Sequence, residues 1–310
     1  SNTQKLHSSV LPIRMKNATF IGITVALFAA ICYGFIPFFT LPLKIDAANN
    51  PNLMSDPSIL FYRFGFAALL IGCGMLAMRK DFRITRGEAV TLIYLSFISD
   101  GSALFLIDGY NYMSSGVATT LHFMYPVVTA LVMMTFYHEA RRISTILAII
   151  MAVGGVAILS WDPTGNTSVR GVIIVLISAV CYALYLIRVN RSRAANMDSL
   201  KLVFYVMFFG ALIFGAEAMR QGVFQPIGTA LQLRNLAFLA VICTVITNIS
   251  LVVAVKRIGS TMTAVIGALE PLTAVIIGCL VFNEAFTWQV AMGILLIIPA
   301  VMMIIWTRRR

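Results

Sequence analysis

Long apolar runs without interruption constrain the fold of this chain more than any other feature. A helix needs roughly 20 apolar residues to cross a hydrocarbon core of about 30 Å, and ten runs reach that length. They lie at 18–40, 58–79, 89–109, 115–137, 143–161, 170–188, 199–219, 234–255, 260–282 and 288–307. The runs are continuous rather than alternating, which excludes strands, because an open sheet edge is not tolerated in lipid. We therefore predict an all-α integral membrane protein with ten transmembrane helices.

The composition excludes a water-soluble enzyme. The chain is 60% hydrophobic and 11% charged, whereas soluble domains carry about 25% charged residues. A net charge of +11 would be compatible with nucleic-acid binding. The basic residues, however, form short clusters between the apolar runs, which is the pattern of membrane topology. We expect membrane lipids, and no nucleic acid, as partners.

Basic residues fall mainly on one side of the predicted crossings. With the N-terminus in the cytoplasm, eighteen of the 23 Lys and Arg residues lie in the inner segments. The outer segments hold Lys44, Arg170, Arg220 and Arg234, and Arg63 lies within a span. Cytoplasmic loops carry the excess of Lys and Arg. Both termini are therefore predicted to be cytoplasmic, with the chain in the plasma membrane (the bacterial inner membrane).

The two halves of the chain repeat each other. GITVALFAAICYGF at 22–35 aligns with GVIIVLISAVCYAL at 171–184, which matches Tyr33 with Tyr182. SSGVATTLHFMYPVVTALVMMTFYHE at 114–139 aligns with GSTMTAVIGALEPLTAVIIGCLVFNE at 259–284. The second alignment matches Ser115, Pro126 and Glu139 with Ser260, Pro271 and Glu284.

Each half contains five spans, so we place the two repeat units at 1–161 and 162–310. Because five is odd, the second unit must enter the membrane from the opposite side. The halves are then inverted repeats, and the interface of inverted repeats typically forms a midplane site used in alternating access.

Several of these residues resemble a known family. The pattern small-Gly-x-Ala-x-x-Leu, followed by Pro and then Glu, closes the fourth and ninth spans, and Tyr62-Arg63-Phe64 opens the second. This pattern is similar to the EamA branch of the drug/metabolite transporter superfamily, and the resemblance covers essentially the whole chain as two five-helix units. It implies export or uptake of small metabolites, often amino acids, through a cavity between the halves. It also implies that the fifth and tenth spans support that cavity from outside.

Ionisable groups at membrane depth are costly and are therefore functional candidates. Asp100 and Glu270 lie midway along the third and ninth spans, His122 a third of the way into the fourth, and Arg63 near the outer end of the second. Arg63 has two readings: it binds a substrate carboxylate, or it snorkels to lipid headgroups. His122 either relays protons with Asp100 or Glu270, or lines the cavity as a neutral hydrogen-bonding residue, the slightly favoured reading.

Helical spacing groups polar and small residues into one stripe on each of five spans. Such stripes indicate either close helix packing or the lining of a cavity, and the charged groups favour the cavity. The predicted cavity residues are Tyr33, Arg63, Asp100, Thr119, His122, Tyr182, Asn248 and Glu270. Asp100, His122 and Glu270 are also the candidates for proton coupling.

Prolines at matching positions predict hinges. Pro126 and Pro271 each remove a backbone donor within a span, and they act either as static kinks or as hinges between the halves. Glu139 and Glu284 precede the fifth and tenth spans, where a carboxylate suits the N-terminal helix dipole, so we expect a structural role. We also expect an ion pair between Glu217 and Arg220.

A secondary transporter accounts for all of these features together. The sequence contains no GxxxxGK[ST] loop and no HExxH motif, and its five cysteines lie within spans without CxxC spacing. We expect no catalytic residues, metal or cofactor. The predicted substrates are amino acids or related compounds, with export favoured. The alternative is a proton-coupled exporter of small cationic or amphipathic drugs, and an intramembrane enzyme or a channel ranks lower. The chain is expected to act as a monomer or homodimer.

Overall fold

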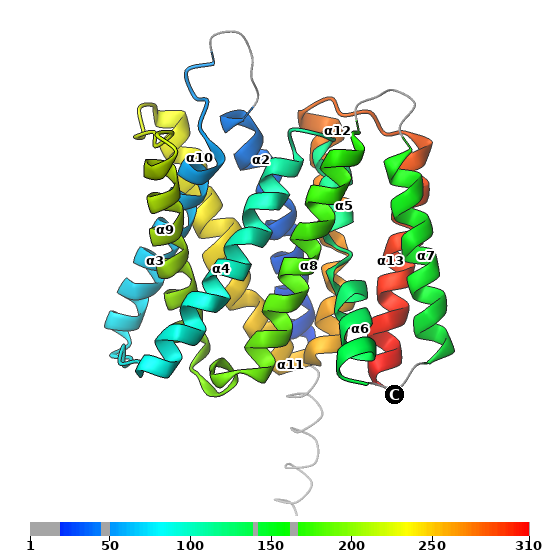
Figure 1. The fold of residues 1–310 in the computed structure, drawn as a ribbon, viewed down its shortest axis with the longest axis horizontal. Coiled ribbons are helices and arrows are strands. Elements are labelled where there is room, and N and C mark those ends of the chain that lie inside the picture. Colours follow the sequence, from blue (N-terminus) through cyan, green and yellow to red (C-terminus); the bar gives the residue numbers. More distant parts are fainter. Residues whose placement is uncertain (1–18, 45–49, 139–141, 162–166, 310) are drawn as a thin grey trace, which may run out of the picture.

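The computed structural model describes residues 19–44, 50–138, 142–161 and 167–309. Every regular element among these residues is a helix, and the helices stand side by side as a bundle (Figure 1). Seven helices are long and apolar enough to cross a membrane, and three shorter apolar helices cover Ile143–Leu159, Leu269–Val281 and Trp288–Ile304. Each of these ten segments overlaps one predicted span, although the ninth covers only 269–281 of the predicted 260–282. The all-helical class is confirmed, while the number of crossings and the cytoplasmic placement of the termini stay predictions.

In the first half of the chain, the first described segment is the helical segment Thr19–Leu43. It ends with α2 (Ile36–Thr40) and the 3₁₀ turn η1 (Leu41–Leu43). The helices that follow are α3 (Asp56–Ala77), α4 (Arg86–Gly109), α5 (Ser115–His122), α6 (Tyr125–Phe136) and α7 (Ile143–Ser160).

The second half begins with α8 (Val169–Arg191) and a short 3₁₀ turn, η2 (Arg193–Asn196). It continues with α9 (Ser199–Arg220), α10 (Ala230–Ala240), the π-helix η3 (Val241–Ile246), α11 (Thr247–Gly267), α12 (Leu269–Val281) and α13 (Trp288–Arg309). We predicted a loop between the eighth and ninth spans. Helical structure instead continues through residues 256–259, within α11.

The bundle is apolar outside and carries polar groups inside. Large hydrophobic side chains such as Leu76, Phe97, Ile150 and Leu280 are exposed on its surface. Buried polar or charged residues include Arg63, Asp100, Ser178, Thr244 and Glu270. This is the arrangement that a lipid solvent favours, because charges are costly at membrane depth unless they face the protein interior.

The first helix of each half packs against the other half. Segment Thr19–Leu43 lies against the second half: an ideal Cβ at Gly34 would lie 2.5 Å from Cβ of Thr273, and the rings of Phe39 and Phe238 are 5.7 Å apart. Conversely, α8 packs on α4 and α5 of the first half. The two halves are therefore interlocked rather than placed side by side as separate domains.

The predicted fourth and ninth spans are each interrupted just before their proline. Span four is divided at Phe123–Met124, between α5 and α6, with Pro126 in the first turn of α6. Span nine is interrupted at Ala268, and Pro271 lies in the first turn of α12. Proline is tolerated in the first turn of a helix, where its missing N–H leaves no bond unmade. Whether the two breaks move as hinges stays a prediction.

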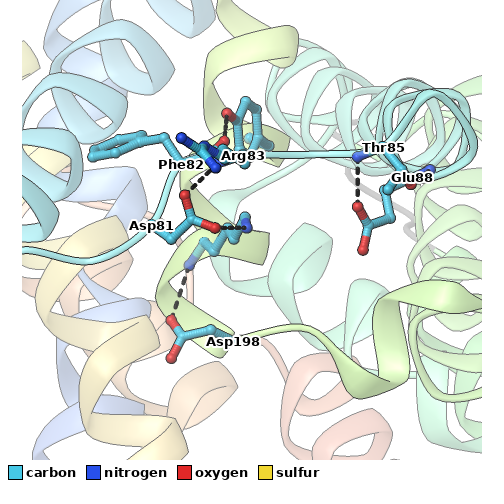
Figure 2. Close-up of polar contacts among 8 residues, drawn as sticks. Asp81, Phe82, Arg83, Thr85, Glu88 and Asp198 are labelled. Carbon is cyan, nitrogen blue, oxygen red and sulfur yellow. Dashed lines mark hydrogen bonds and ion pairs between the residues drawn. The ribbon is translucent and has the colours of Figure 1, made fainter.

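Connections at both ends of the bundle tie α3 to α9. At the predicted cytoplasmic end, the Nζ of Lys80 lies 2.6 Å from Oδ2 of Asp198, and Nζ of Lys201 lies 3.8 Å from Oδ2 of Asp81. Figure 2 shows Asp81 and Asp198 in this region. At the opposite end, the Ser55 hydroxyl donates to the Val223 carbonyl at 2.9 Å. Helices α3 and α9 also pack along their length, so they form a pair fixed at top and bottom.

Candidate functional site

A cavity of about 300 Å³ lies in the middle of the bundle, between the two halves. It falls at the small end of the range for small-molecule sites, about 300–1,000 Å³. Its lining comes from segment Thr19–Leu43 and from α3, α4, α5, α6, α8, α9, η3, α11 and α12, and none of its lining residues belongs to α7 or α13. These two helices pack against each other at the side of the bundle (Figure 1). The supporting position that the family resemblance implies for the fifth and tenth spans is thus what the structure has.

Six of the eight predicted cavity residues line this space. They are Tyr33, Arg63, His122, Tyr182, Asn248 and Glu270. The other two, Asp100 and Thr119, are 3% exposed and are not among the lining residues. The neighbours of Asp100 on α4, Ser99 and Ala103, do line the cavity, so α4 turns Asp100 away from it.

Arg63 is held inside the protein rather than at the lipid headgroups. Its side chain is 5% exposed, and its Nε donates a hydrogen bond to Oγ1 of Thr244 at 3.0 Å. Thr244 lies in the π-helix η3, and its hydroxyl donates in turn to the Leu239 carbonyl at 3.2 Å. π-Helical turns are frequent at functional sites. The snorkelling interpretation of Arg63 is therefore wrong for this structure, and its guanidinium faces the cavity.

Glu270 supplies the acidic group of the cavity. It lies in the first turn of α12, directly after the break at Ala268, and its side chain is 9% exposed. Both Arg63 and Glu270 lie in the described part of the chain, and no ion pair joins them there. The cavity therefore presents a guanidinium and a carboxyl group that are not paired with each other in the described part of the chain.

Aromatic rings surround these charges. Tyr125 and Tyr182 meet edge to face with centroids 4.7 Å apart, and Tyr182 stacks on Tyr185 at 6.0 Å. With Tyr33, these tyrosines line the cavity. Tyrosine presents a π face to cations and a hydroxyl to polar groups, so the walls are suited to an amphipathic or cationic ligand.

His122 forms a defined hydrogen bond at the wall of the cavity. Its Nδ1 lies 3.0 Å from the Ser178 hydroxyl, which also donates to the Ser102 carbonyl at 2.6 Å. Because that hydroxyl proton goes to the carbonyl, Nδ1–H of His122 donates to Ser178 Oγ. The contact links α5, α8 and α4.

The cavity is closed on the side away from the predicted cytoplasm. There an ideal Cβ at Gly116 of α5 would lie 2.6 Å from Cγ2 of Val275 on α12. The Glu284 carboxylate accepts hydrogen bonds from the backbone N–H groups of Ser115 at 2.8 Å and Gly116 at 3.3 Å. Nζ of Lys44 forms an ion pair at 2.6 Å with Asp56.

The contact of Glu284 corrects one prediction. We expected this carboxylate to interact with the N-terminus of the tenth span, and it caps the N-terminus of α5, in the fourth span, instead. The chemistry is as predicted, but the helix belongs to the other half of the chain. Glu139 lies outside the described residues. The expected pair of Glu217 with Arg220 is confirmed at 2.6 Å.

Sequence reasoning missed Tyr125 as a cavity residue. The alignment of the repeats contained the signal, because Tyr125 and Glu270 occupy the same position directly before Pro126 and Pro271. Both residues line the cavity. The π-helix that turns Thr244 and Thr247 toward it has no comparable signature in the sequence. Within the described residues, no group of three or more His, Cys, Asp or Glu side chains could hold a metal ion.

Comparisons with known proteins agree with this architecture. The model of the EamA-like transporter family matches the chain twice, at residues 20–161 and 169–306. One solved structure, described only as the crystal structure of a protein, aligns over 95% of this chain and 98% of its own, with a TM-score of 0.64 and 17% sequence identity. At that identity the likeness concerns the fold alone. No curated protein matches the sequence.

Proposed function

Because this chain belongs to the EamA-like transporter family, a family of multi-span membrane transporters of small molecules, we propose that it carries amino acids or related zwitterions across the plasma membrane. Transport runs by alternating access between the two halves, and export is the favoured direction. Both termini face the cytoplasm in this proposal.

The observation that carries the proposal is the unpaired charge of the cavity. Arg63 and Glu270 line the same 300 Å³ space without forming an ion pair with each other, as far as the described residues go. A guanidinium binds a carboxylate through paired hydrogen bonds, and a carboxylate binds an ammonium group. An α-amino acid supplies both groups, so one ligand satisfies both sides of the cavity.

The closed side of the cavity supports alternating access. Contacts of Gly116 with Val275, and of Glu284 with the N-terminus of α5, join the halves on the side of the cavity away from the predicted cytoplasm. In inverted repeats, one half rocks against the other around a fixed midplane site. Opening the α5–α12 contact would expose the same site to the opposite face of the membrane.

The tyrosines favour a second candidate. Tyr33, Tyr125, Tyr182 and Tyr185 line the cavity beside Glu270, and a cation over aromatic faces gains free energy when it is desolvated. A small lipophilic cation exported in exchange for protons would use this wall and would leave Arg63 without a role. Proton coupling by His122 or Glu270 belongs to either candidate.

Efflux from proteoliposomes distinguishes the candidates. The purified chain is reconstituted and loaded in turn with labelled amino acids and with labelled tetraphenylphosphonium, with and without an imposed pH gradient. Saturable amino-acid release that is lost in both Arg63→Gln and Glu270→Gln supports the proposal. Saturable release of tetraphenylphosphonium that needs Glu270 but not Arg63 supports the second candidate. Saturable release of neither class would overturn both.

A further inference from the structure

We propose that Asp100 is a proton-binding site separate from the substrate cavity, which holds its proton while α4 and α9 are packed together and releases it when they separate. The inference rests on the proposed transporter function and adds to it the place where a coupled proton binds.

Asp100 is enclosed between helices, and the described part of the chain offers it no partner. Its side chain is 3% exposed, and neither carboxyl oxygen is in hydrogen-bonding contact with any described residue. On α9 it faces Gly210, where an ideal Cβ would lie 2.6 Å from Oδ1 of Asp100 and 3.0 Å from the Phe64 ring. Because glycine lacks a side chain, α9 approaches closely enough to cover the carboxyl group.

Within the described ranges, none of the helices packed on α4 directs a charge at Asp100. Helix α3 presents Phe64, and the neighbouring Arg63 donates to Thr244. Helix α8 presents Cys181, whose Sγ would lie 3.6 Å from a Cβ at Gly101.

The remaining titratable groups around α4 are engaged or distant. His122 of α5 is hydrogen-bonded to Ser178 of α8. Arg193 of η2 packs against Gly87, thirteen residues along α4 from Asp100 and hence about 20 Å away at 1.5 Å per residue. Helix α9 contributes Gly210, which has nothing to titrate.

The free energies of the two protonation states decide the behaviour of such a group. Burying an ionised carboxylate without a partner costs far more than burying the neutral acid. Asp100 therefore keeps its proton in this arrangement of helices. When α4 and α9 separate, a water molecule reaches the carboxyl group, the O–H bond breaks, the proton passes to water, and the carboxylate remains hydrated. Proton release is thereby tied to a movement between helices rather than to ligand contact.

Infrared spectroscopy of the purified chain in lipid bilayers tests this without any substrate, so its result is independent of the transport assays. At pH 7 the wild type should show the C=O band of a protonated, buried carboxylic acid. The band should disappear in Asp100→Asn and persist in Glu270→Gln. Identical spectra of the wild type and Asp100→Asn would overturn the proposal.

A glycine pair tests the link to helix separation. Gly210→Ala places a methyl group against Oδ1 of Asp100 and against the Phe64 ring, so the carboxyl group must leave its place under α9. The band should then be lost at pH 7 and return on acidification. Gly74→Ala, where no atom lies within 4 Å of the new Cβ, is the matched control and should keep the band.

Wild-type exchange provides the same test if Gly210→Ala fails to fold. On transfer to deuterium oxide the band should shift slowly, with the opening of the α4–α9 interface. An immediate shift would place Asp100 in contact with water and contradict the proposal.

Discussion

Two side chains of opposite charge share the cavity without touching each other. Arg63 is oriented by Thr244 of the π-helix η3, and Glu270 by the helix break before Pro271. A direct ion pair would have neutralised both groups and left the cavity with little to recognise. Kept apart, each is available for a ligand group of the opposite charge.

Replacing Glu270 tests the anionic side. Glu270→Gln keeps the size and removes the charge, so it should lower kcat/KM for a zwitterionic substrate by at least about tenfold. A hydrogen bond to a charged group is worth about 1.5–3 kcal/mol, and about 1.4 kcal/mol corresponds to tenfold. Initial rates in proteoliposomes measure the effect. Glu217→Gln, which breaks an exposed ion pair outside the cavity, should transport like the wild type.

The sequence identified these charged residues because charge at membrane depth is rare. It could not tell which of them face the cavity, because neighbouring positions on a helix differ by about 100°. Ser99 lines the cavity while Asp100, one residue further, is covered by Gly210 of α9. Which side faces the cavity depends on how α9 approaches α4, a tertiary contact that the pattern of either helix alone does not specify.

At the scale of helices, glycines allow the two halves to approach each other closely. Gly116 of α5 is the clearest case, because a Cβ there would lie 2.6 Å from Cγ2 and 2.9 Å from the Cα of Val275. A backbone atom cannot turn aside as a side-chain end can. The α5–α12 contact therefore depends on having no side chain at position 116.

Gly116→Ala should destabilise the protein by about 1–3 kcal/mol, the usual cost of overpacking, and lower its thermal unfolding temperature in detergent. Gly74→Ala introduces the same methyl group into open space on α3 and should leave that temperature unchanged or slightly higher, since alanine favours a helix. Equal unfolding temperatures for both variants would mean that α5 and α12 do not pack as closely as described.

The connection between α8 and α9 contains Asp198, whose contribution to stability depends on pH. The hydrogen bond that Lys80 donates to Asp198, together with hydrogen bonds from backbone N–H groups, lowers the pKa of the Asp198 carboxyl group. Since the folded pKa lies below the unfolded value of about 3.9, the stabilisation is present above that pH and is lost as the pH falls through the folded pKa.

Asp198→Asn keeps a side chain suited to the N-cap of α9 and removes this charge. It should cost about 1 kcal/mol or less at pH 7 in low salt, because the pair is partly exposed and screened by solvent. The cost should vanish in high salt and at pH values below the folded pKa. Thermal unfolding followed across salt and pH measures this, and a loss independent of both would contradict an electrostatic origin.

Periodicity and apolar length were enough to predict the ten helical segments, because a bilayer leaves few alternatives for a continuous apolar run. The breaks within spans four and nine were only partly accessible. Pro126 and Pro271 indicated a disturbance, but the π-helix at 241–246 and the helical continuation through 256–259 depend on packing against neighbours.

For the molecule as a whole, α3 and α9 form a unit fixed at both ends. Their ties are the Lys80–Asp198 pair at one end and the contact of Ser55 with Val223 at the other. In the proposed alternating access, the halves would then rock around this pair rather than through it.

Cysteines placed at positions 80 and 198, in a background without the native cysteines, can be joined by a short thiol cross-linker. The linked protein should transport at a rate within about twofold of the unlinked protein. This is well under the tenfold change that about 1.4 kcal/mol would produce. Single-cysteine variants treated with the same reagent serve as controls. Loss of transport in the linked protein alone would show that α3 and α9 move relative to each other during the cycle.

The exchange of first helices between the halves has a consequence for biosynthesis. Segment Thr19–Leu43 is made before the other described helices, yet it packs on α10, α11 and α12 of the second half. Domains usually fold in the order in which they are made. Segment Thr19–Leu43, however, can complete its packing only after the second half has been inserted into the bilayer. A nascent chain that stops after its first half would thus expose the helix surfaces that the second half covers in the complete bundle.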